Sequence, residues 1–220
     1  MLKIPGKAQS RPELLLLLSI LSGILMLPVL DHADYRRVIL GVWTFVPIIL
    51  LTLRLSRIKR YVHSSVALMF TAVGFTLASA LFPNRALVAT KWVVLTAFFA
   101  LTIGGLFSYL RCSRAITDAH LYTAASIYLL IGILWFAVYS AIDAVKPDSI
   151  VLVKTARTTR ESELLYFSLV TLSTIGYGDI VPMNNEVRML AALEGITGVL
   201  YVAITVALLI GKYMRQDGSG

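Results

Sequence analysis

Long apolar runs without charge constrain this chain more than any other feature of its sequence. The first extends from Leu14 to Leu30, and several runs of similar length follow it. A helix needs about 20 apolar residues to cross the hydrocarbon core of a bilayer. The chain has 220 residues, of which 58% are hydrophobic, and its mean hydropathy is +0.81. We therefore expect most of it to form helices that span a lipid bilayer.

Short polar stretches divide the apolar sequence into six predicted transmembrane helices. They span Leu14–Leu30, Val38–Leu53, Ser65–Leu81, Leu87–Tyr109, Leu121–Ile142 and Arg188–Gly211. The first run could also be a signal peptide, since Lys3 and Lys7 precede it. It exceeds the usual signal core of about 7–15 residues and is followed by no small-x-small cleavage site, which favours a retained helix.

Basic residues gather at alternate ends of the predicted helices. Those expected on one side of the membrane are Lys3, Lys7, Arg11, Arg54, Arg57, Lys59, Arg60, Arg111, Arg114, Lys212 and Arg215. Because Lys and Arg in short loops mark the cytoplasmic side, both termini should be cytoplasmic in a multi-pass protein of a plasma membrane or bacterial inner membrane. The net charge of +8 does not indicate a nucleic-acid partner, since these residues are not collected in a soluble domain.

Few residues are arranged for catalysis or metal binding. Cys112 is the only cysteine, so the chain cannot form an internal disulfide. His32, His63 and His120 fall in separate interhelical stretches without a second ligand at metal-binding spacing. The sequence also contains no phosphate loop or nucleophile elbow. We expect neither enzymatic activity nor a cofactor.

A short apolar segment precedes the last predicted helix. Between Glu161 and Thr174 there are too few apolar residues to cross a bilayer. Its apolar residues are Leu164, Leu165, Tyr166, Phe167, Leu169, Val170 and Leu172. This pattern predicts a helix that enters the membrane without leaving on the far side. Such a segment is tolerated where irregular backbone is buried in protein or lines a water-filled path.

The next residues, Thr174-Ile175-Gly176-Tyr177-Gly178-Asp179, resemble the filter signature of the potassium-channel pore family. In that family four subunits each contribute one strand, and rings of carbonyl oxygens replace the water shell of a potassium ion. The resemblance implies K+ as the permeant ion of a homotetramer in a lipid bilayer. It implies K+ sites at the carbonyls of Thr174, Ile175, Gly176 and Tyr177.

The residue types of this segment suit a row of carbonyls facing one axis. Such a row requires backbone outside the ordinary α and β regions, and glycine adopts positive φ without a Cβ penalty. Gly176 and Gly178 provide that freedom. Ile175 and Tyr177 are then expected to point away from the axis and to pack against the preceding helix.

The resemblance also implies residues that support the filter from behind, which are Tyr166, Thr171 and Asp179. Tyr166 stands where voltage-gated members of the family carry the first of two tryptophans. We expect its hydroxyl to form a hydrogen bond with Asp179 and to slow collapse of the filter.

The implied fold is an all-α membrane protein that assembles as a tetramer. Each chain would have six transmembrane helices, with a re-entrant pore helix and the selectivity filter between the fifth and the sixth. Residues 1–110 would form a four-helix transmembrane domain in the position of a voltage sensor, and residues 111–120 a linker. Residues 121–220 would form the pore domain, made of outer helix, turret, pore helix, filter and inner helix.

The predicted inner helix contains candidates for a hinge and a gate. Gly198 falls where the family places its hinge glycine, and Gly195 lies one turn earlier. Either could permit bending, or could allow close helix packing in the membrane. Val202, Val206 and Ile210 share one face, which by family register meets the ion path. They would form a hydrophobic gate there, or would instead pack against lipid or other helices.

Glu194 is the one carboxyl group well inside a predicted span, which marks it for a structural or functional role. A hydrogen bond to a pore-helix hydroxyl, from Ser168 or Thr171, is one interpretation. A proton sensor is the other.

The predicted fourth helix lacks the arginines of a voltage sensor. From Leu87 to Tyr109 its only charge is Lys91, so we expect weak or no voltage sensing. Arg54, Arg57 and Arg60 have three-residue spacing, but they lie at the cytoplasmic end of the second helix, where they fit anchoring better.

Two questions stay open at the level of sequence. The basic stretch from Lys146 to Arg160, the turret, is either a solvated loop or a docking surface for a toxin, lipid or regulatory partner. Alternatives to a potassium channel subunit are a non-selective cation channel, a potassium transporter subunit, and a silent subunit that conducts only with a partner.

Overall fold

The computed structural model describes residues 11–29, 59–82, 84–112, 117–152 and 159–217. Within these ranges the chain is almost entirely helical. The helices are α1 (Arg11–Val29), α3 (Lys59–Leu81), α4 (Arg85–Cys112), α5 (Asp118–Val145), α6 (Arg160–Leu172) and α7 (Asn185–Asp217). Two three-residue strands, β1 (Ile150–Leu152) and β2 (Ile180–Pro182), pair antiparallel with Val151 opposite Val181.

Five of the six predicted ranges are helical, as α1, α3, α4, α5 and α7. The sixth, Val38–Leu53, lies outside the described residues. By length and composition, three stretches are candidate membrane spans: Arg85–Arg111, Asp118–Val145 and Asn185–Met214. The apolar parts of α1 and α3 are shorter, at Pro12–Leu27 and Val66–Ser79. The described residues therefore support a membrane protein with three candidate spans, and six spans stay a prediction.

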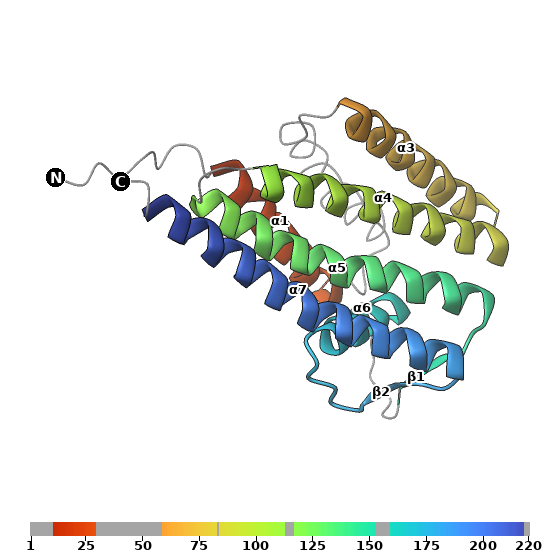
Figure 1. The fold of residues 1–220 in the computed structure, drawn as a ribbon. Coiled ribbons are helices and arrows are strands. Elements are labelled where there is room, and N and C mark those ends of the chain that lie inside the picture. The colour runs from red at the N-terminus through yellow and green to blue at the C-terminus, as the bar shows by residue number, and fades with distance from the viewer. Residues whose placement is uncertain (1–10, 30–58, 83, 113–116, 153–158, 218–220) are drawn as a thin grey trace.

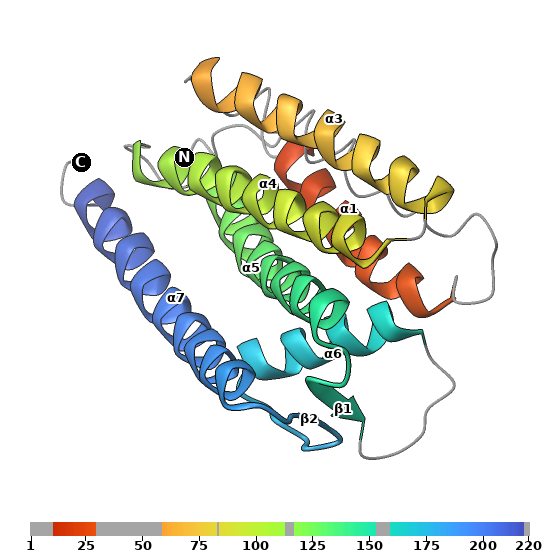
Figure 2. The ribbon, with the colours of Figure 1, turned by 90° about the vertical axis from the view of Figure 1, so that its right-hand side faces the viewer.

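Helix α5 lies at the centre of the molecule. It packs against α1, α4, α6 and α7, and α3 packs on the far side of α4. Helices α1, α3 and α5 run in one direction and α4 and α7 in the other (Figures 1 and 2). The short α6 lies between α5 and α7 at the end of the molecule that carries β1 and β2 (Figure 2). Helices α1 and α4, from the predicted first domain, thus pack directly on α5 of the predicted pore domain, and the division into domains stays a prediction.

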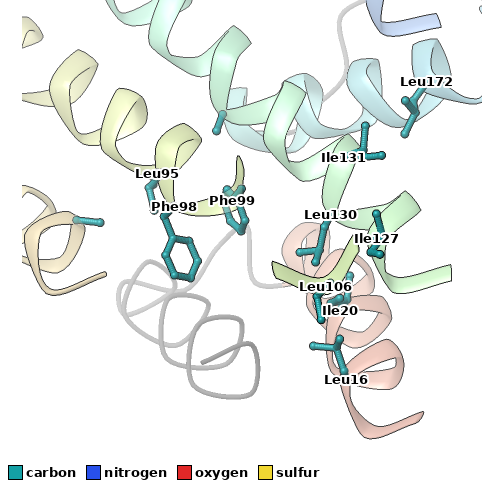
Figure 3. Packing of buried hydrophobic residues seen from close by; sticks show 12 residues of the cluster. Leu16, Ile20, Leu95, Phe98, Phe99, Leu106, Ile127, Leu130, Ile131 and Leu172 are labelled. Atoms are coloured by element: carbon teal, nitrogen blue, oxygen red, sulfur yellow. The ribbon is translucent and has the colours of Figure 1, made fainter. Parts of the chain in front are cut away.

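Two apolar clusters hold these helices together. The larger one joins α1, α4 and α5 and includes Leu16, Ile20, Leu106, Ile127 and Leu130, which lie close together in Figure 3. The smaller one joins α5, α6, α7 and both strands and includes Phe136, Tyr139, Leu164, Phe167 and Ile180. In lipid these contacts stabilise by van der Waals packing, because the surrounding acyl chains are as apolar as leucine.

Glycines let α6 approach both of its neighbours. A Cβ on Gly132 of α5 would lie 2.8 Å from Cδ2 of Leu169. A Cβ on Gly198 of α7 would overlap the carbonyl oxygen of Leu172, the last residue of α6. Of the two roles considered for Gly198, close packing is the one that this contact favours.

Arg160 ties the start of α6 to the rest of the fold. Its guanidinium donates to Asp143 Oδ1 at 2.6 Å, to the Ile150 carbonyl at 2.6 Å and to Glu163 Oε2 at 3.2 Å. The hydrogen bond to the Asp143 carboxylate is the main cause that raises the pKa of Arg160. Arg160 therefore belongs to the helix framework and not to a solvated turret; Lys154 and Arg157 lie outside the described residues.

Replacing Gly198 with alanine should push the end of α6 away from α7, because the new methyl group has no space beside Leu172. Overpacking of this kind destabilises by about 1–3 kcal/mol. The expected result is a lower melting temperature of the purified protein, followed by tryptophan fluorescence. Gly195→Ala is the matched control, because its methyl would lie 3.6 Å from the Thr171 carbonyl oxygen, an ordinary contact. Equal melting of the two variants would contradict the packing role.

Candidate functional site

The backbone of residues 174–178 alternates between positive and negative φ. Thr174, Gly176 and Gly178 have φ values of +59°, +56° and +77°, while Ile175 and Tyr177 are not among the positive-φ residues. Alternation of left- and right-handed residues turns successive peptide groups toward the same side. Gly176 and Gly178 adopt this conformation at no steric cost, whereas Thr174 loses about 1–2 kcal/mol. The predicted role of the two glycines matches their geometry.

Hydrogen bonds from α6 hold the first half of this segment. The Thr174 N–H donates to the Thr171 carbonyl at 3.0 Å. The N–H groups of Ile175 and Gly176 both donate to the Val170 carbonyl, at 3.0 Å and 3.4 Å. These carbonyls belong to the last turn of α6 and have no hydrogen-bond partner within the helix. The N–H groups of residues 174–176 provide that partner, and the same hydrogen bonds hold the backbone of these residues against the end of α6.

A side-chain contact holds the other end. The Tyr166 hydroxyl donates to Asp179 Oδ2 at 2.8 Å, and Asp179 Oδ1 accepts from the Ile180 N–H at 3.1 Å. The hydrogen bond expected between Tyr166 and Asp179 is therefore present, and its effect on collapse of the filter stays a prediction. Desolvation and then the Asp179 carboxylate raise the pKa of Tyr166 to about 12, so the hydroxyl keeps its proton through neutral pH.

The side chains between these two anchors have few contacts within one chain. Ile175 is 53% exposed and Tyr177 is 69% exposed. The expectation that they pack against the preceding helix stays a prediction, since more than half of each residue is exposed in one chain. Their apolar surface is left for contacts that one copy does not provide.

An open groove of about 490 Å³ separates this segment from α7. Thr171, Thr174 and Gly176 line one side, and Ala191, Gly195 and Val199 are among the α7 residues on the other. The predicted gate residues continue along α7 beyond the groove. Their exposed fractions are 48% for Val202, 48% for Val206 and 54% for Ile210. This face of α7 thus has little cover from its own chain.

Glu194 lies behind the same segment and is completely buried. Its Oε1 lies 2.5 Å from the Ser168 hydroxyl oxygen, and its Oε2 accepts from the Tyr139 hydroxyl at 2.7 Å. Of the two predicted partners, Ser168 makes the contact, while Thr171 lines the groove. Sequence reasoning missed Tyr139, because 55 positions separate it from Glu194 and no local pattern joins them.

No cluster of three or more His, Cys, Asp or Glu side chains in the described ranges is placed to hold a metal ion. Three carboxyl groups near this segment and at the start of α6 have protein partners: Asp143 contacts Arg160, Asp179 contacts Tyr166, and Glu194 contacts Ser168 and Tyr139. The exposed polar groups of the site are instead those of residues 174–178.

Comparison with known proteins agrees with this geometry. Residues 148–215, which contain β1, α6, the 174–178 segment and most of α7, match the model of a family described as ion channel. That stretch is similar to ion channels.

The curated relatives are potassium channels. Two pore potassium channel a of Oryza sativa subsp. japonica is 38% identical over 81 residues, which are 37% of this chain and 20% of the relative. Inward rectifier potassium channel Kirbac3.1 of Paramagnetospirillum magnetotacticum is 30% identical over 63 residues, 29% of this chain and 21% of the relative.

Voltage-gated potassium channel Kch of Escherichia coli is 38% identical over 50 residues, 23% of this chain and 12% of the relative. The matched part thus spans about a fifth or less of each of these three relatives. No solved structure matches the chain.

Tyr166→Phe should loosen residues 178–180 without disturbing α6, because it removes one hydroxyl and leaves the ring. A hydrogen bond to a half-exposed carboxylate contributes about 1 kcal/mol, or roughly a fivefold change in local opening. Backbone amide exchange of Asp179 and Ile180, measured by mass spectrometry, should accelerate by that factor. Tyr213→Phe, on an exposed tyrosine near the end of α7, is the control. Unchanged exchange in Tyr166→Phe would show that the contact does not hold the segment.

Proposed function

We propose that this chain is a subunit of a potassium-selective channel that conducts K+ passively across a membrane. The observation that carries the proposal is the alternating φ of Thr174, Gly176 and Gly178 within the sequence Thr-Ile-Gly-Tyr-Gly. In this backbone the carbonyls of Thr174, Ile175, Gly176 and Tyr177 form the ion sites and replace the hydration shell of K+. The similarity of residues 148–215 to ion channels supports the same conclusion.

A single strand cannot surround an ion, so we propose that four copies form one filter as a homotetramer. The exposed Ile175 and Tyr177 would pack on a neighbouring copy and set the diameter of the carbonyl ring. The exposed face of α7 would be covered in the same assembly. Cyclic symmetry would place all four filter strands on one axis.

In the membrane, α6 would be a re-entrant pore helix and the chain would have six spans with both termini cytoplasmic. The parallel course of α1, α3 and α5 is compatible with this orientation (Figure 1). Lys212 near the end of α7 donates to the carbonyls of Leu110 and Arg111 at the end of α4, so these two helix ends lie on one side.

For gating, we propose that four α7 faces converge at Val202, Val206 and Ile210 and stop ions by dewetting. Since Gly198 is packed against α6, Gly195 is left as the hinge candidate. A regulatory partner or toxin bound to the turret stays a hypothesis without support from the described residues.

The selectivity proposal is tested by the reversal potential of the purified protein in planar bilayers under opposed K+ and Na+ gradients. We expect a value near the K+ equilibrium potential, which shifts by about 59 mV per tenfold gradient. A value near zero would favour a non-selective cation channel. No current, with the tetramer intact by native mass spectrometry, would favour a silent subunit; a stable monomer would contradict the proposal.

Voltage dependence should be shallow. Moving one elementary charge through 100 mV contributes about 2.3 kcal/mol, and Lys91 is the only charged residue from Leu87 to Tyr109. We expect the conductance of the reconstituted protein to change little between negative and positive potentials. Arg57 lies outside the described residues, and a steep curve abolished by replacing it would contradict this prediction.

A further inference from the structure

The number of protons shared among Glu194, Ser168 and Gly132 follows from the distances between their oxygen atoms. The Ser168 hydroxyl oxygen lies 2.5 Å from Glu194 Oε1 and 2.7 Å from the carbonyl oxygen of Gly132. Both distances are hydrogen-bond distances for oxygen pairs. A serine hydroxyl has one proton, and a backbone carbonyl has none to give. The two short contacts therefore need a second proton.

An ionised Glu194 cannot provide it. If Ser168 donated to a carboxylate, its oxygen and the Gly132 carbonyl oxygen would face each other as two acceptors at 2.7 Å. If Ser168 donated to Gly132 instead, its oxygen would face a negatively charged Oε1 at 2.5 Å without a proton between them. Both arrangements leave a buried repulsive contact, and unpaired buried polar groups are costly.

We infer that Glu194 is a neutral carboxylic acid whose proton lies between Oε1 and Ser168. The acid donates to the Ser168 oxygen, and Ser168 donates to the Gly132 carbonyl. The Tyr139 hydroxyl donates to Oε2. Every short contact then has one proton, and the chain of donors runs from α7 through α6 to α5.

The surroundings of Glu194 favour the neutral form. The side chain is completely buried, and within the part of the chain that the structure describes no basic side chain forms an ion pair with it. An isolated charge in such a place is expensive and normally takes up a proton. The titratable groups that face it are the phenols of Tyr139 and Tyr128 on α5, while α6 contributes the Ser168 hydroxyl.

This acid is a positioning residue for the filter. Ser168 lies two residues before Val170, whose carbonyl holds the N–H groups of Ile175 and Gly176. Loss of the proton would break the donor chain and release the middle of α6 from α7. This positioning role rests on the proposed channel function, whereas the protonation state does not.

Infrared spectroscopy of the purified protein in an ester-free detergent tests the protonation state directly. Labelling glutamate at its side-chain carboxyl with carbon-13 identifies the C=O stretch of a protonated acid by its isotope shift. At neutral pH we expect this band in the wild type and a clear decrease in Glu194→Gln, with Glu13→Gln as the control for the other buried glutamate of the described residues. Glu186→Gln, which removes an exposed carboxylate from the same helix, should retain it. A wild-type spectrum with carboxylate bands alone would overturn the inference.

The pH dependence of the melting temperature distinguishes a protonated Glu194 from a side chain that only fills space. Gln can replace the acid, because its amide donates to Ser168 and its oxygen accepts from Tyr139. The native acid holds a proton that an exposed glutamate releases at neutral pH, so stability should fall as pH rises. The melting temperature of the wild type should therefore decrease with rising pH relative to Glu194→Gln. Parallel pH profiles would overturn the inference, and Tyr139→Phe, which retains the acid, should keep the wild-type slope.

Current measurements distinguish failure of the neutral-acid inference from failure of the channel proposal. The wild-type current should decline at alkaline pH, and the decline should be absent in Glu194→Gln. If the infrared band is present but no variant conducts, the channel proposal fails and the neutral acid remains. If the protein conducts K+ but the band is absent, the neutral acid fails and the channel proposal remains.

Discussion

The position of α6 between α5 and α7 is the constraint on which the rest of the structure depends. This helix has 13 residues, too few to cross a bilayer, and in the proposed re-entrant position its polar ends would have to be satisfied inside the protein. Arg160 satisfies groups at its start, and the N–H groups of residues 174–176 satisfy carbonyls at its end. Gly132 and Gly198 allow both neighbouring helices to come close enough for these contacts to form.

Polar contacts specify this arrangement more sharply than apolar ones do. Apolar helices in lipid gain little from burying surface against each other, whereas a misplaced polar group in hydrocarbon is expensive. Hydrogen-bond contacts of Glu194 with Ser168 and Tyr139 join α7 to α6 and α5. The Tyr201 hydroxyl of α7 donates to the Ala124 carbonyl of α5 at 2.7 Å. These contacts fix the register of α7 against α6, and with it the position of the exposed side chains of Val202 and Val206.

Within one chain, residues 174–178 are held by hydrogen bonds to α6 but keep exposed side chains. Residues 174–178 are anchored by Val170 at one end and by Tyr166 at the other. Between the anchors, Ile175 and Tyr177 expose apolar surface that the described part of their own chain leaves uncovered. The proposed assembly around a common axis would cover this surface.

The sequence by itself determined the class of protein, the positions of the described helices and the residues of the candidate filter. Apolar run length sets the helices, because a bilayer demands about 20 apolar residues, and the Gly-Tyr-Gly spacing sets the backbone, because only glycine accepts its φ freely. The tertiary structure alone decided that Arg160 belongs to the framework, that Gly198 touches Leu172, that β1 pairs with β2, and that Tyr139 completes the environment of Glu194. These contacts join residues far apart in the chain, and their existence depends on how the helices pack, which no local pattern of residues encodes.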